Sequence, residues 1–233
     1  DAVYSERQSR ENRRMSATIF RGASLIDPDC DTPHSGDLCV VNGVIADHAP
    51  ASATLIDCAG LCLAPGIIDI GVKVSEPGER HKESFRTAGR AAAAGGVTTM
   101  VTRPDTDPAI DTPEVLEFVR RRAAEAALVR VAHMAALTKG RAGREMVEVG
   151  FLSDAGAVAF TDCDRVVTDT KVFGRALTYA RSLGALVIAH PQDTGLSSGA
   201  AATSGKFASL RGLPAVSPMA ERLGLERDLA MVE

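Results

Sequence analysis

Residues 64–111 constrain the fold of this chain more than any other stretch. An apolar run over 67–74 ends at a Glu-Pro-Gly turn, and an alanine-rich segment over 82–94 follows it. A second apolar run over 97–102 then leads into a Pro-Asp-Thr-Asp-Pro loop. This order predicts a strand, a helix and a second strand parallel to the first. Loops that leave the carboxyl ends of parallel strands are where α/β proteins build their active sites.

The same alternation continues towards the end of the chain. Strands are predicted over 128–136, 156–161 and 185–190, and helices over 113–126, 142–151, 169–183 and 217–231. The strands are apolar nearly throughout, which is typical of a parallel sheet covered by helices. We therefore predict an α/β fold, a (β/α) barrel of the TIM type. A complete barrel takes about 250 residues, so the roughly five strand–helix units within 64–233 predict the amino-terminal part of a longer barrel.

Two segments precede the predicted barrel. Residues 15–63 alternate short β-prone runs with turn signals, and Asn42-Gly43 between two apolar runs is typical of a tight hairpin. This pattern predicts a small antiparallel β domain. Residues 1–14 are polar and charged without apolar periodicity, which indicates a disordered extension or a cloning remnant.

Composition narrows the classes of function. The chain is 45% hydrophobic with a net charge of −4, and no basic patch interleaves with aromatic residues. Nucleic acid and anionic membranes are therefore not expected as partners. No apolar run has the length of a membrane span, and no stretch indicates a signal peptide. The five cysteines form no C-x-x-C pair, which predicts reduced thiols in a cytoplasmic protein.

Three blocks of the sequence are specific enough to indicate ancestry. They are APGIIDIGVKVSEPG with the following HKESFRTAGRAAAAGGVTTMVTRPDTDP, then GAVAFTDCDRVVTDTKVFGRALTYA, and ALVIAHPQD with the later LRGLPAVSPMAE. Over roughly residues 15–233 their order and spacing resemble the bacterial dihydroorotase family of cyclic amidohydrolases. The resemblance implies an amidohydrolase barrel, zinc-dependent hydrolysis of a cyclic amide and a place in pyrimidine biosynthesis.

The resemblance also locates the family's metal ligands, most of which are altered here. A His-x-His pair at the end of the first strand corresponds to Gly71 and Lys73, which provide no ligand and a repelling ammonium group. The metal-bridging aspartate corresponds to Cys163, whose thiolate can bind zinc. His190 alone matches a family ligand, although a lone histidine is more often a core residue. His133, on the third predicted strand, is assigned to the core.

The positions that would contact substrate are altered as well. The family's arginine for the substrate carboxylate corresponds to Ser75, and the asparagine of its Met-Pro-Asn motif corresponds to Asp105. A carboxylate repels an anionic substrate, whereas a bidentate arginine attracts it. We therefore assign no catalytic residue and expect no cofactor, with zinc expected only if the site proves functional.

Lys73 has an alternative role that needs no metal. Its ammonium group could pair with Asp69, Asp105 or Asp162 and supply one positive charge at the strand end. Cys163 is interpreted as a buried structural thiol, because free cysteine behaves mainly as a small hydrophobic residue. Asp162 is interpreted as a loop or capping residue.

Three functions are compatible with these residues. The first is a dihydroorotase-like protein with a degraded metal and substrate site that acts as a non-catalytic structural partner. The resemblance implies aspartate transcarbamoylase as that partner, with self-association as a second expectation. The next is an active amidohydrolase, a dihydroorotase or another cyclic amide hydrolase, with an atypical or absent metal centre. There Cys163 beside His190 could act as a nucleophile. The last is a ligand-binding barrel without a partner.

Overall fold

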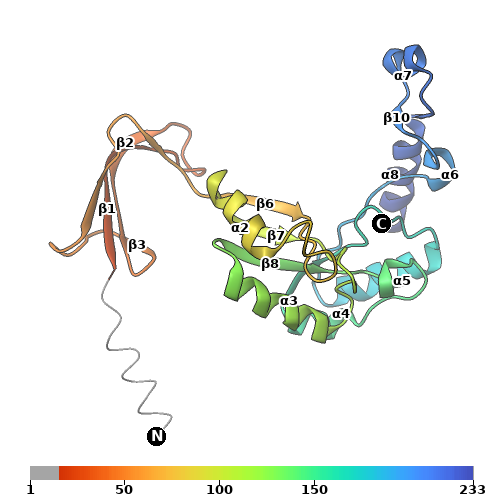
Figure 1. The fold of residues 1–233 in the computed structure, drawn as a ribbon, viewed down its shortest axis with the longest axis horizontal. Coiled ribbons are helices and arrows are strands. Elements are labelled where there is room, and N and C mark those ends of the chain that lie inside the picture. Colours follow the sequence, from red (N-terminus) through yellow and green to blue (C-terminus); the bar gives the residue numbers. More distant parts are fainter. Residues whose placement is uncertain (1–15, 233) are drawn as a thin grey trace, which may run out of the picture. The chain divides into compact units, whose positions relative to one another are not determined.

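The chain divides into two compact units between Pro65 and Gly66. A computed structural model describes residues 16–232, and Figure 1 shows both units along the chain. The prediction for residues 1–14 lies outside the described residues. Within 16–232, no helix combines the length and the apolarity that crossing a bilayer requires.

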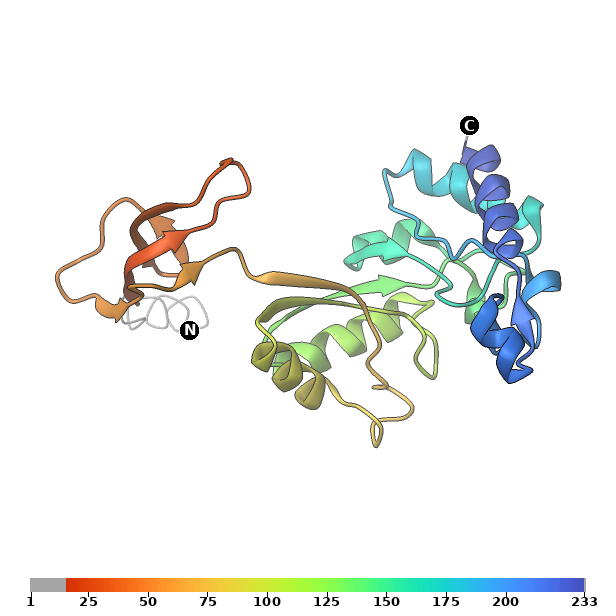
Figure 2. The same ribbon diagram turned by 90° about the horizontal axis from the view of Figure 1, so that it is seen from above.

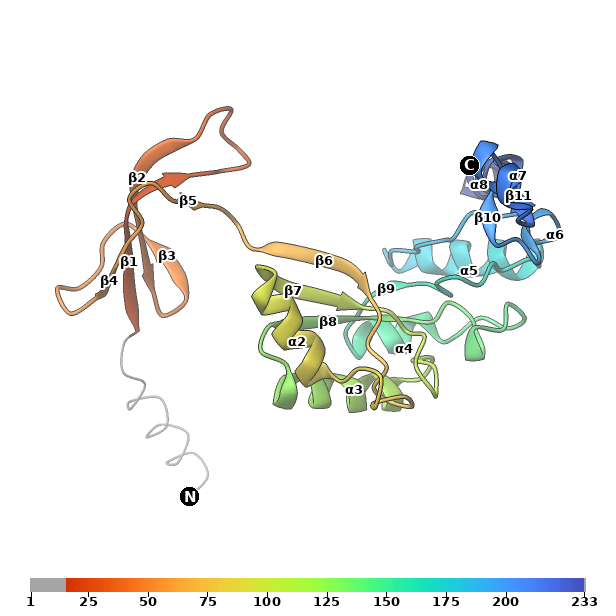
Figure 3. The same cartoon turned by 45° about the horizontal axis from the view of Figure 1, so that its top comes forward.

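The first unit is a single five-stranded sheet (Figure 3). Its strands are β1 (Ala17–Leu25), β2 (His34–Val41), β3 (Val44–Ala46), β4 (Thr54–Asp57) and β5 (Cys62–Leu63). As expected, β2 pairs antiparallel with both β1 and β3, the latter across the Asn42-Gly43 turn. However, β4 and β5 pair parallel with β1. The sheet is therefore mixed rather than purely antiparallel, because the chain after β3 crosses to the free edge of β1 instead of turning back beside β3.

The second unit is built on four parallel strands in sequence order. They are β6 (Ile67–Val72), β7 (Val97–Thr102), β8 (Arg130–Ala135) and β9 (Ala157–Phe160). The helices that follow them are α2 (Phe85–Ala94), α3 (Pro113–Ala126), α4 (Val149–Asp154) and α5 (Thr170–Ser182). Figures 2 and 3 place α2 and α3 on the same side of the strands. This arrangement confirms the predicted α/β fold.

The main hydrophobic core lies between this sheet and its helices. It includes Phe85 of α2, Met100 of β7, and Leu116 and Val119 of α3, each almost completely buried. Burying side chains of this size is the main stabilising contribution in a domain of this kind. On β6 the apolar side chains stay open instead, with Ile68 60% and Ile70 67% exposed. The sheet therefore has an uncovered surface at β6, as a partial barrel requires.

The strand predicted over 185–190 is present only as a single bridge. Val187 bridges Phe160 in parallel, and the amide of Phe160 donates to the carbonyl of Leu186 at 2.8 Å. The amide of Ile188 donates back to the carbonyl of Phe160 at 2.9 Å. Within residues 16–232 no further strand pairs with this segment, so it does not form a ladder. The described sheet has four strands rather than the predicted five.

The helix predicted over 142–151 is wrong in its first half. Gly143 has a φ of +69°, which interrupts a right-handed helix. The neighbouring backbone turns back on itself, and the amide of Val147 donates to the carbonyl of Leu137 at 3.1 Å. Only the short helix α4 remains. The other elements are the 3-10 helix η1 (Lys139–Arg141), α6 (Thr194–Ser197), β10 (Ala202–Thr203), α7 (Lys206–Arg211), β11 (Ala215–Val216) and α8 (Met219–Val232).

Glu76 attaches the loop after β6 to helices α2 and α3. Its buried carboxylate accepts a hydrogen bond from the amide of Phe85 at 3.1 Å and another from Nε of Arg122 at 3.1 Å. The first contact satisfies an amide at the start of α2, and the second reaches α3. Ser84 completes this helix start, because it forms a capping box with Thr87.

His133 of β8 is buried among apolar groups, as predicted. Its Nδ1 lies 2.7 Å from the hydroxyl of Thr102, and its ring meets the ring of Phe85 edge-on with centroids 5.8 Å apart. Its Nε2 is buried without a hydrogen-bond partner. Burial lowers the pKa of His133 from 6.5 to about 4, and the positive charge of Arg120 acts in the same direction.

We expect His133 to make the protein sensitive to acid. Its depressed pKa means that the unfolded chain binds the proton first, so stability is complete above pH 6.5 and is lost as the pH falls towards 4. The loss is on the order of 3 kcal/mol. Urea unfolding from pH 7 to pH 4 should show this slope, and His133→Gln should flatten it. The variant His81→Gln, which changes an exposed histidine, should keep the wild-type slope.

Candidate functional site

The candidate site lies at the carboxyl ends of the four parallel strands. The loops after β6, β7, β8 and β9 all leave the sheet at this edge. This is the edge at which α/β barrels carry their active sites. The structure brings together here the metal and substrate positions that the resemblance located, namely Gly71, Lys73, Ser75, Asp105, Cys163 and His190.

Gly71 has a backbone conformation that side chains rarely adopt. Its φ is +96°, and the register between β6 and β7 shifts between Ile70 and Val72, as it does at a β-bulge. A Cβ added at Gly71 would meet no atom within 4 Å. The backbone angle, and not a lack of space, therefore disfavours a histidine at this position.

Lys73 pairs with one of the three aspartates that the sequence offered. Its Nζ lies 3.0 Å from Oδ2 of Asp105, and the same oxygen accepts a hydrogen bond from a terminal nitrogen of Arg103 at 2.9 Å. The Asp105 side chain is only 3% exposed, whereas that of Lys73 is 56% exposed. A buried carboxylate needs such partners, because leaving it unpaired is costly.

The pairing continues beyond Arg103 to a second aspartate. Arg103 lies 3.6 Å from Oδ1 of Asp164, and Arg141 contacts the same oxygen at 2.5 Å. Arg141 also donates to the backbone carbonyl of Asp162. We call Lys73, Asp105, Arg103, Asp164 and Arg141 the ion-pair chain. Its members come from the ends of β6 and β7, from η1 after β8, and from the loop after β9.

Asp162 holds the loop after β8 against β9. Its Oδ1 accepts the amides of Leu137 and Thr138, both at 3.0 Å, and its Oδ2 accepts the Thr138 hydroxyl. Burial raises the pKa of Asp162 above its usual value, and these hydrogen bonds oppose the increase. Both oxygens of this carboxylate accept hydrogen bonds from the loop after β8, which supports the interpretation of Asp162 as a loop residue.

Cys163 and His190 line one cavity of about 340 Å³ together with Gly71 and Arg103. Cys163 is half-buried, and burial raises the pKa of its thiol, with Asp105 adding to the increase. The thiol is therefore less readily ionised than an ordinary cysteine. His190 is exposed rather than part of the core, and its Nε2 lies 3.1 Å from Oε1 of Gln192.

These residues do not fit a hydrolytic zinc centre. Such a centre needs about three protein ligands that leave one position open for water. The part of the chain from 16 to 232 contains no group of three His, Cys, Asp or Glu side chains that could hold a metal ion. Gly71 offers no donor, Lys73 is bound to Asp105, and the pKa of the Cys163 thiol is raised.

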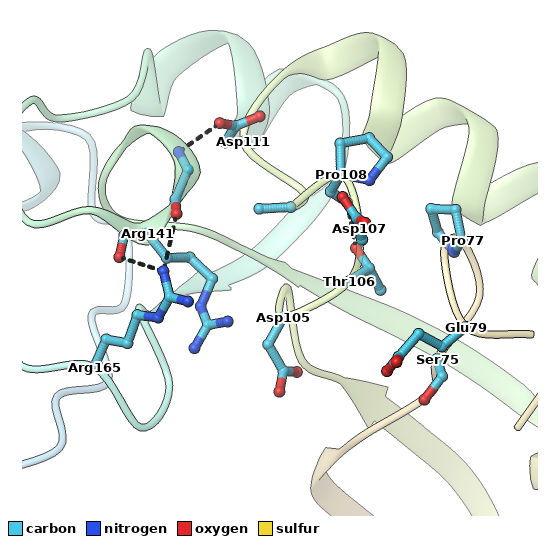
Figure 4. A pocket seen from close by; sticks show the side chains of 12 residues that line it. Ser75, Pro77, Glu79, Asp105, Thr106, Asp107, Pro108, Asp111, Arg141 and Arg165 are labelled. Carbon is cyan, nitrogen blue, oxygen red and sulfur yellow. Dashed lines mark hydrogen bonds between the residues drawn. The ribbon is translucent and has the colours of Figure 1, made fainter. Parts of the chain in front are cut away.

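A second cavity of about 570 Å³ opens between the same loops. Figure 4 shows the guanidinium groups of Arg141 and Arg165 on one side, and Ser75 and Glu79 on the other, with Asp105 between them. Ser75 and Asp105 are the two positions that the resemblance assigns to substrate. The Asp105 carboxylate is already paired with Lys73 and Arg103, and unlike an asparagine it has no hydrogen-bond donor to offer to a substrate.

The sequence did not identify the arginines of this site. Arg103 lies two residues before Asp105 in the chain, and this pair of opposite charges was a usable signal. Arg141 contacts Asp164 across 23 residues. No local pattern marks that contact, because it depends on the turn formed by η1.

Solved structures of similar shape show which fold the chain shares. L-hydantoinase (dihydropyrimidinase) from Arthrobacter aurescens aligns with a TM-score of 0.74 at 18% identity, covering 94% of this chain and 50% of that one. A D-hydantoinase aligns with a TM-score of 0.70 at 19% identity, covering 93% of this chain and 49% of that one. The fold is that of the amidohydrolase barrel, present here in part.

Sequence relatives give the family. A family model described as Dihydro-orotase-like matches residues 60–233, and the chain belongs to this family. It is 36% identical over 221 residues to the dihydroorotase of Syntrophus aciditrophicus (strain SB), covering 92% of this chain and 52% of that protein. It is 40% identical over 219 residues to a dihydroorotase-like protein of Pseudomonas aeruginosa, covering the same shares of the two chains. The chain spans about half the length of the curated relatives it matches.

We expect Asp162 to be important for stability. The change Asp162→Ala leaves the buried amides of Leu137 and Thr138 without an acceptor, so the free energy of unfolding should fall by roughly 2–4 kcal/mol. Chemical denaturation measures this change. Asp154→Ala, which removes an exposed carboxylate, is the matched control and should alter stability little. Equal effects of the two substitutions would contradict the role assigned to Asp162.

Proposed function

We propose that this protein is a non-catalytic member of the dihydroorotase-like family that acts as a structural partner in pyrimidine biosynthesis. The observation that carries the proposal is the strand end at Gly71 and Lys73. One position has a φ of +96° and no side chain, and the other is held in an ion pair with Asp105. Neither provides a ligand where the family resemblance places its His-x-His pair.

The chemistry of cyclic amide hydrolysis supports this proposal. A hydrolytic metal lowers the pKa of its bound water and polarises the amide carbonyl, and both effects need a firmly held ion with an open position. Of the ligand positions within this chain, His190 is the only one that still has the expected residue type. Cys163 would first have to lose a proton that burial favours keeping.

The charges around the second cavity support it as well. The family's substrate carboxylate would need a cationic or neutral donor at positions 75 and 105. Ser75 is a weak neutral group and Asp105 is a carboxylate. Ser75 can donate one neutral hydrogen bond and the Asp105 carboxylate none, so these two positions bind an anion less tightly than a bidentate arginine and an amide would.

An active amidohydrolase with an atypical centre is the second candidate. The observation in its favour is that Cys163, His190 and Arg103 line the same cavity. A cysteine and a histidine there could form a nucleophile and its base. The raised pKa of the Cys163 thiol argues against this role, because catalytic cysteines have lowered pKa values.

Activity and metal content of the full-length protein separate these two candidates. We expect no interconversion of dihydroorotate and carbamoyl aspartate above the uncatalysed rate, with or without added zinc. We also expect less than about 0.1 equivalent of zinc per chain by elemental analysis. Turnover that disappears in both Cys163→Ser and His190→Ala would instead establish the second candidate.

The partner is tested separately. The resemblance implies aspartate transcarbamoylase, so the full-length protein should co-elute with the transcarbamoylase of the same organism in size-exclusion chromatography. An unrelated protein of similar mass should elute apart from it. Elution as two independent proteins would contradict the partner while leaving the non-catalytic assignment intact.

A further inference from the structure

We propose that the ion-pair chain replaces a bound metal as the element that holds the strand ends together, so that this edge of the sheet is stable without any divalent cation. Lys73, after β6, supplies a positive charge, and its ammonium group forms an ion pair with the carboxylate of Asp105, after β7. The inference goes beyond the proposed function, because such an arrangement would stabilise the fold whether or not the protein catalyses a reaction.

The first support is connectivity. Lys73 follows β6, Arg103 and Asp105 follow β7, Arg141 lies in η1 after β8, and Asp164 follows β9. The contacts from Lys73 to Asp105, from Arg103 to both aspartates, and from Arg141 to Asp164 join all four connections. A metal ion bound by residues from several strand ends would make the same kind of cross-link.

The second support is the charge balance. The ion-pair chain has three cationic and two anionic side chains, so its carboxylates are fully compensated and one positive charge is in excess. Asp105, the more buried of the two aspartates, has two cationic neighbours within 3.0 Å. A divalent cation arriving here would meet net repulsion, because the charges that would attract it are already paired.

The third support is the backbone at Gly71. A β-bulge changes the direction of the side chains that follow it. The register between β6 and β7 shifts between Ile70 and Val72, immediately before Lys73. The bulge therefore lies directly before the contact between Lys73 and Asp105 and belongs to the same arrangement at the end of β6.

Burial distinguishes this pair from an ordinary surface ion pair. Lys82 and Glu79, which lie later in the same connection between β6 and α2, form a pair in which the side chains are 58% and 48% exposed. Asp105 is only 3% exposed. Exposed pairs contribute little to stability, whereas the loss of one partner of a buried charge is costly.

A double-mutant cycle in the full-length protein tests the proposal. The variants are Lys73→Met, Asp105→Asn and the double change, with Lys82→Met, Glu79→Gln and their double change as the matched control cycle. We expect the Lys73–Asp105 pair to show a coupling of about tenfold in the unfolding equilibrium constant, and the control pair about twofold or less. Lys73→Arg, which keeps the charge, should retain most of the wild-type stability. Equal coupling in the two cycles would overturn the proposal.

Metal dependence gives a second, independent readout. The melting temperature of the wild-type protein should not change on dialysis against a chelator or on addition of zinc. A decrease with the chelator that zinc reverses would overturn the proposal. Neither readout uses activity, so an active enzyme with a metal-independent melting temperature would refute the proposed function and leave this inference standing.

The backbone conformation at Gly71 is tested separately. Gly71→Ala should destabilise the protein, because alanine is strained at a φ of +96° although the space is open. Gly205 is equally open and has an extended φ of 165°, so Gly205→Ala should be tolerated. Equal tolerance of both substitutions would contradict the role assigned to the positive φ at Gly71.

Discussion

Parallel pairing of β6 to β9 is the constraint on which the rest of the second unit depends. It places four connections, which are far apart in the sequence, at one edge of the sheet. Side chains from these connections then lie close together whatever their chemistry. In a hydrolase of this architecture the shared edge would collect ligands and acid–base groups. In this chain it collects the lysine, arginines and aspartates of the ion-pair chain, which compensate one another.

The fold was largely predictable because its local signals agree with the tertiary structure. The apolar runs became β6 to β9, and Thr112 followed by Pro113 starts α3 as their chemistry indicates. The failures have tertiary causes. The segment around Val187 pairs with β9 only at Phe160, a contact between residues far apart in the sequence that no apolar run can indicate. Residues 142–148 use their backbone groups in a turn that no helical propensity could indicate.

The sequence identified most of the residues that meet at the site, but only some of the contacts between them. The resemblance located Gly71, Lys73, Asp105 and Cys163, and the charges indicated that Lys73 would find a carboxylate. Which aspartate it contacts depends on the bulge at Gly71, and a bulge leaves no clear mark in one sequence. Hydrogen-bond partners separated by twenty or more residues are fixed by packing and not by spacing along the chain.

The buried carboxylate of Glu76 has a consequence for how such a site can change. Glu76 attaches the loop after β6 to α2 and α3 through two hydrogen bonds that do not involve the residues of the ion-pair chain. Ser75, immediately before Glu76, can therefore differ without loss of these two contacts, whereas Lys73 also pairs with Asp105 at the strand ends. The residue that attaches this loop to the helices is therefore not the residue that lines the cavity beside it. Side chains at the cavity can change while the hydrogen bonds of Glu76 keep the loop attached.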